Sequence, residues 1–523
     1  MRFLTFLLII VLQPGTSVAS TELTAANQQI RNYDWLTNGR KSGALVLTVD
    51  FDKQTRITKF EFNDRGRGPS LLAKAHIGEK ERVMELVISG HSYMGAPVDE
   101  NFISTCESAR WSSPLEEGSS SETNSFYLAN DGTPEQTAQL ARALLATPEG
   151  KLDLLPNGRA SISKLSSLEI SAGPGQFTID LYAISGAQMN PQFIWLDEHL
   201  ELFGLSAGSN ALVPEGLGFA ARKIKLAQEA EEARFYRQRS TPLTRKLPPV
   251  YSVSNVNVVN VGLGFILPLR TVIVKNGVIH KILGRANVPP TDMFRVDGNG
   301  GWLIPGLWDM HTHNRLPGGL LHIAGGVTTV RDLGNNPDNY LKVSKSFDSG
   351  EVIGPRSYAA GIIEGKSPYS APIDDLAESE ADAVALVRKY AALGYPQIKI
   401  YSSTSPEWVP AVAAEAHRNN MRVSGHIPAF MNAEQAIRDG YDEIQHIYML
   451  YLNFLASETD DTRTPLRFTL IAEKATELDM ESEVFNAFLD LLKSRDITVD
   501  PTVAIVDNML RHRSGTLSHS FAK

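Results

Sequence analysis

The sequence has little cysteine, no excess of basic residues and, beyond its first segment, no long hydrophobic run. Its 523 residues include one cysteine, Cys106, which excludes an internal disulfide framework and a cysteine-rich zinc site. The 50 basic and 59 acidic residues give a net charge of −9, so there is no basic stripe to follow nucleic acid. A hydrophobic content of 42% is too high for a disordered chain. The length predicts two or three globular domains.

The first residues have the pattern of a secretory signal peptide. Arg2 supplies a positive charge, residues 3–12 are apolar, and Ser17-Val18-Ala19 is a small-x-small cleavage site. The apolar run is too short to span a bilayer comfortably. We therefore expect residues 1–19 to be removed and the mature protein to be exported, either to a periplasm or out of the cell, with no membrane span.

Residues 20–218 are expected to form a β-rich N-terminal domain. Segments 42–51 and 81–90 carry runs of β-branched residues that end in polar or glycine stops. Pro156-Asn157-Gly158 is a plausible tight turn between two strands. One helix is expected after Thr133, because Pro134 suits a first helical turn. No catalytic constellation is visible in this domain.

A linker and a small sheet follow. Residues 219–250 read as a mixed-charge helix that ends in a proline-containing linker. Residues 251–305 contain β-runs, and Asn276-Gly277 between alternating apolar residues is a strong hairpin signal. We expect this segment to be a small β-sandwich portion.

Residues 306–523 alternate between short apolar strands and amphipathic helices. Strands are expected at 327–334, 397–401, 421–427 and 443–447, with helices at 379–393 and after Ser405 and Asn432. Such alternation predicts an α/β fold with a parallel sheet, either an open doubly wound sheet or a closed barrel.

Metal-ligand side chains recur near the carboxyl ends of these strands. His311 and His313 lie two residues apart in a strand, so both imidazoles can face one interior. Lys399, His426 and His446 each lie within an apolar β-run, where a titratable group is costly unless it is paired or coordinated. The carboxyl ends of barrel strands converge on one mouth, where enzymes of that fold place their sites. The set predicts a metal site, although a lone strand histidine is usually structural.

The segments GGWLIPGLWDMHTH and VTTVRDLG, the buried lysine and the two later histidines resemble the amidohydrolase superfamily. The resemblance covers residues from about 250 to 510 and is strongest to imidazolonepropionase-like enzymes and metal-dependent Xaa-Pro dipeptidases. It implies a (β/α)8 TIM-type barrel with a small β-sandwich. It also implies a divalent metal, zinc first, with manganese or iron as alternatives.

The resemblance implies roles for individual residues. His311 and His313 would hold one ion and His426 and His446 a second, bridged by a carboxylated Lys399. The alternative for Lys399 is an ion pair with a nearby acid. Two interpretations of Tyr401 stay open: its side chain faces the cavity, or it packs within the barrel. Two aspartates are expected to order the strand ends or to support the ligands: Asp309 and Asp332.

One group of the family pattern is not found in this sequence, namely the aspartate at the end of strand 8 that acts as general base. Residues 306–523 number 218, whereas such a barrel typically needs about 250. Residues 497–507 look like strand 7, and their Asp500 and Asp507 stand in the wrong context to replace the base. We therefore expect an incomplete barrel, truncated at its C-terminus, and leave the catalytic residue unassigned.

The leading functional prediction is a metal-dependent hydrolase that attacks amide or cyclic-amide C–N bonds with metal-activated water. The expected partner is a small-molecule amide or dipeptide-like substrate. A narrower alternative is an Xaa-Pro-type dipeptidase. An alternative of another class is an inactive, truncated metal-binding fragment without the general base.

Overall fold

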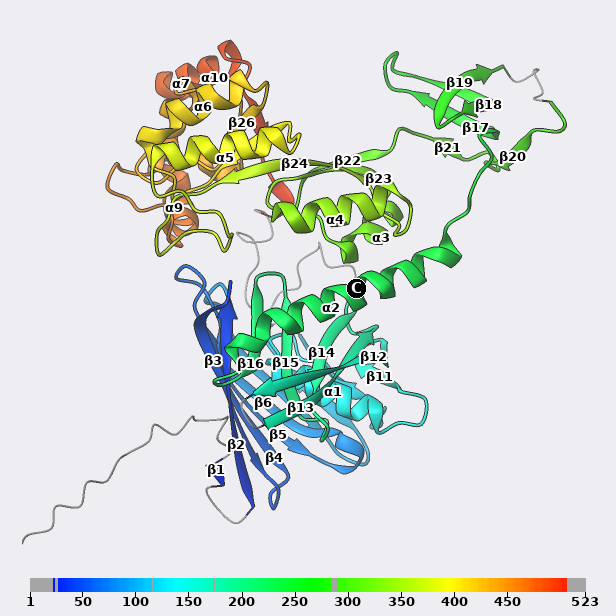
Figure 1. Ribbon diagram of the computed structural model, residues 1–523, viewed down its shortest axis with the longest axis vertical. Coiled ribbons are helices and arrows are strands. Elements are labelled where there is room, and N and C mark those ends of the chain that lie inside the picture. Colours follow the sequence, from blue (N-terminus) through cyan, green and yellow to red (C-terminus); the bar gives the residue numbers. More distant parts are fainter. Residues whose placement is uncertain (1–21, 24–26, 115, 173–174, 285–289, 506–523) are drawn as a thin grey trace, which may run out of the picture.

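The computed structural model describes residues 22–23, 27–114, 116–172, 175–284 and 290–505. The predicted signal peptide, Asp507 and the tail with His512 lie outside the described residues. The fold is mixed α/β, with a large antiparallel β-domain in the N-terminal part and a parallel, barrel-like sheet in the C-terminal half (Figure 1). Among the residues described, no helix is long and apolar enough to cross a membrane.

The β-domain is one 16-stranded sheet, which is antiparallel except where β10 meets β11. Its strands are β1 (Glu22–Leu23), β2 (Gln28–Thr37), β3 (Arg40–Asp50), β4 (Thr55–Phe62), β5 (Ser70–Ile77), β6 (Val83–His91), β7 (Pro97–Ser104), β8 (Ala109–Ser112), β9 (Glu117–Ser120), β10 (Phe126–Tyr127), β11 (Lys151–Leu155), β12 (Arg159–Ala172), β13 (Gly175–Ser185), β14 (Gln192–Leu196), β15 (Leu202–Ala207) and β16 (Asn210–Pro214). The last strand, β16, pairs with β2, so the two halves of the domain share one continuous sheet.

Helix α1 (Pro134–Leu145) packs on this sheet and completes its core. Its Leu140 and Leu144 are fully buried in the core of this domain. The expected turn at Pro156-Asn157-Gly158 does connect β11 with β12, which pair antiparallel. Because α1 shields one face of the sheet, polar side chains between them must find partners inside the domain.

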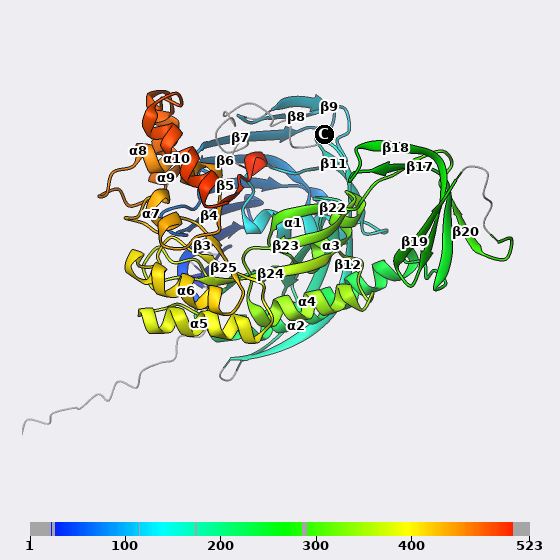
Figure 2. The same ribbon diagram turned by 90° about the horizontal axis from the view of Figure 1, so that it is seen from above.

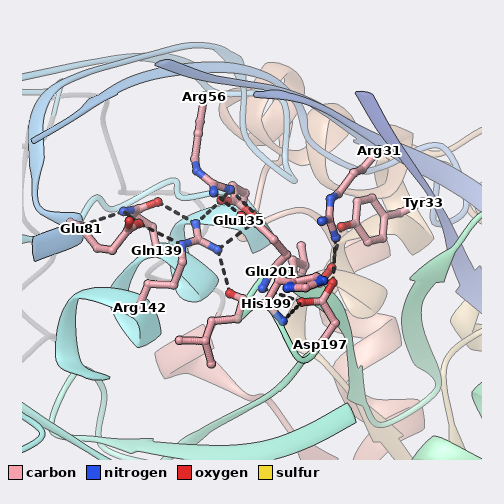
Figure 3. A network of polar contacts seen from close by, with 12 residues as sticks. Arg31, Tyr33, Arg56, Glu81, Glu135, Gln139, Arg142, Asp197, His199 and Glu201 are labelled. Atoms are coloured by element: carbon pink, nitrogen blue, oxygen red, sulfur yellow. Dashed lines mark hydrogen bonds and ion pairs between the residues drawn. The ribbon is translucent and has the colours of Figure 1, made fainter. Parts of the chain in front are cut away.

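A network of charged side chains occupies this interior (Figure 3). Arg56 donates to Glu135 and Glu201, each at 2.8 Å, and Arg142 lies beside the same two carboxylates. Burial alone would raise the pKa of Glu201, but the hydrogen bonds from Arg56 and the charge of Arg142 bring it down to about 2. Glu201 is therefore ionised and charge-paired at neutral pH.

Helix α2 (Ala221–Ser240) runs from the β-domain across to the barrel (Figure 1). Its Phe235 and Tyr236 pack against Val343 and Phe347 of the barrel. The Ser240 hydroxyl accepts a 2.9 Å hydrogen bond from the backbone N–H of a barrel loop residue. These contacts join the two large domains.

Residues 250–303 form one five-stranded sheet that stands apart from the β-domain in Figures 1 and 2. Its strands are β17 (Val250–Asn260), β18 (Phe265–Lys275), β19 (Val278–Leu283), β20 (Phe294–Asp297) and β21 (Trp302–Leu303). The expected Asn276-Gly277 hairpin joins β18 to β19.

The C-terminal half contains a nearly closed parallel sheet of seven strands in sequence order. The strands are β22 (Leu307–Thr312), β23 (Val327–Asp332), β24 (Arg356–Ile363), β25 (Gln397–Ile400), β26 (Arg422–Gly425), β27 (Glu443–Gln445) and β28 (Thr498–Asp500). The helices are α3 (Leu316–Ala324), α4 (Pro337–Asp348), α5 (Glu380–Ala392), α6 (Val409–Arg418), α7 (Ala433–Arg438), α8 (Ile447–Leu455), α9 (Leu466–Lys474) and α10 (Glu483–Ser494). The observed sheet is thus closer to a closed barrel than to an open doubly wound sheet.

Local sequence explains where these helices begin. The side chains of Asn336, Ser379, Asn432 and Ser482 each accept a hydrogen bond from the backbone N–H three residues ahead. Inside the sheet, Arg331 of β23 forms a buried ion pair with Glu443 of β27. This pair links alternate strands, as interior layers of such barrels do.

Candidate metal centre

The predicted ligands all lie at the carboxyl ends of the parallel strands. His311 is in β22 and His313 follows it, Lys399 is in β25, and His426 and His446 come directly after β26 and β27. Because parallel strands end at the same rim, these side chains meet at one mouth. His446 adopts a positive φ of 68°, which turns the chain from β27 into α8.

The structure brings the five side chains into contact. Lys399 Nζ lies 3.2 Å from His311 Nε2, and the Nε2 atoms of His426 and His446 are 3.0 Å apart. The ring centroids of His311 and His446 are 4.9 Å apart, and those of His311 and His313 are 6.0 Å apart. Five residues that are spread over 136 positions of the sequence therefore lie in a single cluster.

Each imidazole is held through its Nδ1 atom, which leaves Nε2 for the cluster. The partners lie 2.8–3.1 Å away: Asp500 for His311, the Gly334 carbonyl for His313, Ser402 for His426 and Thr502 for His446. Metal-binding histidines are typically held in this way, because the second nitrogen fixes the ring orientation and tautomer.

Burial keeps the imidazoles neutral. It is the largest cause of the lowered pKa values of all four rings, and the positive charge of Lys399 adds to it in each case. The pKa of His313 falls to about 4. Neutral imidazole is the form that binds metal ions.

Lys399 is 1% exposed, and burial lowers its pKa to about 7. The charges of Asp500 and Asp332 oppose this shift without overcoming it. Within the described ranges, Lys399 Nζ has no carboxylate at ion-pair distance, so the ion-pair alternative for this residue is not seen there. Its ammonium or amine group instead faces the imidazoles.

The predicted supporting aspartates both bind the backbone around the first two histidines. Asp309 accepts a 3.0 Å hydrogen bond from the His311 N–H. Asp332 is completely buried and accepts from the N–H groups of Asn314 and Gly334, each at 2.9 Å. Burial raises the pKa of Asp332 to about 6, against these hydrogen bonds. Asp332 thereby joins the loops that follow β22 and β23.

Tyr401 and Asp500 complete the wall of the cluster. The Tyr401 ring lies 4.5 Å from the His426 ring and 5.0 Å from Lys399 Nζ, measured to its centroid. Asp500 of β28 reaches across to His311 of β22 at 2.8 Å, and it also lies 3.3 Å from Arg331. Asp500 therefore links the two edge strands of the sheet and orients a histidine.

Two of the remaining histidines lie outside the cluster. His417 is exposed and contacts Asp442. His322 is only half-buried on α3, with its Nδ1 4.0 Å from Asp309 Oδ2. Sequence reasoning missed Arg331 and Arg467, since a lone arginine in an amphipathic pattern carries no signal for the interior.

The donor set fits a divalent ion in part. Two imidazole nitrogens on one tetrahedral zinc lie about 3.3 Å apart, close to the 3.0 Å between His426 and His446 Nε2. Among the residues that the structure describes, no three histidine, cysteine, aspartate or glutamate side chains are grouped as ligands of a single ion. The His426–His446 pair therefore has a nitrogen spacing near that of two ligands of one ion, and Lys399 Nζ lies against His311.

Comparisons with known proteins gave matches only among solved structures. No family model matches the chain, and no curated protein matches it. A candidate prolidase from Bifidobacterium longum is 24% identical with a TM-score of 0.34, over 38% of this chain and 55% of that one. An Xaa-Pro dipeptidase with methionine bound in its active site is 17% identical with a TM-score of 0.36, over 51% of this chain and 71% of that one. Molinate hydrolase is 16% identical with a TM-score of 0.36, over 52% and 79%.

These structural neighbours are amidohydrolase-superfamily proteins, distant in sequence, and they match about half of this chain. The chain spans 55% of the length of the Bifidobacterium protein.

Proposed function

We propose that this protein is a metal-dependent hydrolase that cleaves amide or cyclic-amide C–N bonds. The convergence of four Nδ1-anchored imidazoles and one buried lysine at a single mouth of the parallel sheet carries this proposal. Structural histidines usually stand alone, and a buried lysine is costly, so the combination favours a metal centre. Zinc is the first choice, because imidazole suits it well.

His311 and His313 would hold one ion, and His426 and His446 a second. When bound, the metal would acidify a water molecule and polarise the scissile carbonyl. Lys399, which lies against His311, would supply an oxygen ligand if its amine adds to carbon dioxide and loses one proton to form a carbamate. Asp500 would fix the His311 ring, and Tyr401 would line the substrate side.

Binding of metal is the first test. Full-length protein incubated with zinc and then desalted should retain zinc by elemental analysis. His446→Ala and His313→Ala should each lower the bound zinc, whereas His417→Ala should not, because His417 lies on the surface of α6. Equal zinc content in all four proteins would contradict the ligand assignment.

Turnover is the second test. The zinc-loaded protein should release free amine or acid from a panel of N-acyl amino acids, dipeptides including Xaa-Pro, and cyclic amides. Zinc retention without turnover of any of them would support the inactive metal-binding fragment instead. Preference for Xaa-Pro dipeptides over the other amides would select the narrower dipeptidase function.

We also propose that residues 1–19 direct export. The positive start, the apolar run and the Ser17-Val18-Ala19 motif support this. Expression in a bacterial host should yield a mature chain that begins at Ser20 by N-terminal sequencing of the exported fraction. A chain that keeps Met1 and stays in the cytoplasm would contradict it.

A further inference from the structure

The β-domain places a tight turn against the mouth of the barrel. The turn joins β4 to β5, and Asp64 and Arg67 are hydrogen-bonded to each other through their backbones. A methyl group on Gly66 would lie 3.6 Å from Pro465 Cδ, next to the first residue of α9. The side chains of Arg65 and Arg67 are only 23% and 14% exposed, although both stand at the tip of a turn. The barrel therefore covers this tip.

Arg467 of α9 is a second buried guanidinium on the barrel side of this junction. It is 9% exposed, and its Nε has no hydrogen-bond partner among the described residues. Its guanidinium stacks over the Phe468 ring at 4.7 Å, and within the same ranges it has no carboxylate at ion-pair distance. The Phe468 ring packs against Tyr448, with the ring centroids 5.2 Å apart, and Tyr448 stacks on His446 at 5.3 Å, so this junction adjoins the metal-centre histidines.

The charges at this junction do not balance. Arg65 is held by Asp64 through two hydrogen bonds of 2.7 and 3.0 Å, and Arg67 lies 3.3 Å from the same carboxylate. Two guanidiniums and one carboxylate leave a charge of +1, and Arg467 raises it to +2. Burial, together with the charges of Arg65 and Arg467, lowers the pKa of Arg67.

The other acids near the junction are already engaged. Glu364 accepts backbone hydrogen bonds from Gly365, Ala371 and Ser403, and burial raises its pKa to about 7, so it supplies only part of a counter-charge. Asp461 pairs with Arg463. A buried cation without a partner is costly, and guanidinium is well suited to carboxylates. The junction therefore has the character of a site for an anion that the described part of the chain does not supply.

We propose that Arg467 and Arg67 together bind a carboxylate group of the substrate, so that the β-domain forms part of the substrate site. This inference rests on the proposed hydrolase function and narrows it. Substrates would be amides with a free carboxylate, such as N-acyl amino acids or dipeptides, in preference to uncharged cyclic amides. Arg65, which is occupied by Asp64, would only add to the positive potential.

Binding of matched small molecules to the full-length, metal-free protein tests this inference separately from catalysis. N-acetylglycine carries the carboxylate, and N-acetylglycinamide has nearly the same shape without the charge. Titration calorimetry and thermal shift should show binding of N-acetylglycine and none of the amide. Arg467→Met and Arg67→Met should each weaken that binding by about 10- to 100-fold, the loss expected for a hydrogen bond to a charged group.

Arg463→Met is the matched control, because its guanidinium is already paired with Asp461. It should bind N-acetylglycine like the unmodified protein. Arg467→Met should also unfold at the same or a higher temperature in the absence of ligand, since it removes an unpaired buried charge. The inference would be overturned if Arg467→Met bound N-acetylglycine as tightly as the unmodified protein. It would also be overturned if the unmodified protein bound the two compounds equally well, or bound neither. Failure of zinc binding alone would overturn only the hydrolase function.

Discussion

Removal of Arg56 should destabilise the β-domain strongly. Arg56 is 8% exposed and donates to Glu135 and Glu201 at 2.8 Å (Figure 3). Arg56→Met keeps most of the side-chain volume but leaves two buried carboxylates with Arg142 as their main cation. Breaking a buried ion pair from one side costs about 3–5 kcal/mol, because the remaining charge is left buried. This is a large part of the roughly 5–15 kcal/mol that stabilises a domain.

The loss of stability caused by Arg56→Met should become smaller as the pH falls. The pKa of Glu201 in the folded protein is about 2, below its ordinary value of 4.5. Its stabilising contribution is therefore complete above pH 4.5 and disappears as the pH falls toward 2. In Arg56→Met the unpaired carboxylate can take up a proton as the pH falls. The difference in stability between the two proteins should accordingly be smaller at pH 4 than at pH 7.

Native-state hydrogen exchange with mass spectrometry is the appropriate assay, because a chain of several domains does not unfold in one step. Peptides from α1 and β14 should exchange at least about 100-fold faster in Arg56→Met at pH 7, since each 1.4 kcal/mol is a factor of ten. Arg159→Met is the control: Arg159 pairs with Asp153 on the surface of the same domain. Equal exchange rates in the two variants would refute the argument that burial decides the cost.

Two further predictions concern the metal centre. Asp500→Asn should weaken zinc binding by about 10- to 100-fold in competition with a chromophoric chelator, because it loosens the partner of the His311 ring; unchanged affinity would contradict this. Gly425→Ala should give little folded protein, since its methyl group would lie 2.1 Å from the Ile400 carbonyl oxygen. Gly394→Ala, where φ is also positive but no atom lies within 4 Å, should remain folded with a slightly lower midpoint in thermal denaturation. Similar yields of the two glycine variants would argue against close packing beside His426.

The order of strands and helices followed from local sequence to a large extent. Capping side chains such as Ser379 and Asn432, and turn pairs such as Asn276-Gly277, act within a few residues, and the structure has the elements that they predict. The parallel sheet also followed, since the alternation of strands and helices allows little else. The same alternation predicted which side chains lie at strand ends, namely His311, Lys399, His426 and His446.

Contacts between distant segments could not be predicted from the sequence. Asp500 was expected to stand in the wrong context, yet it lies beside His311 across the gap between the two edge strands. The orientation of the imidazoles depends on their Nδ1 partners, and all four partners come from other segments of the chain. No local pattern marks such partners.

The sequence by itself determined the chemistry that is available: one cysteine, a mildly acidic chain, and histidines with a lysine at the ends of parallel strands. Local propensity and periodicity act over a few residues, which is why these features could be read directly. Only the tertiary structure decided that the turn between β4 and β5 lies against the barrel, and that the buried Arg467 Nε has no hydrogen-bond partner among the described residues. Burial and charge balance depend on every segment that packs around a group, so they exist only once the whole chain has folded.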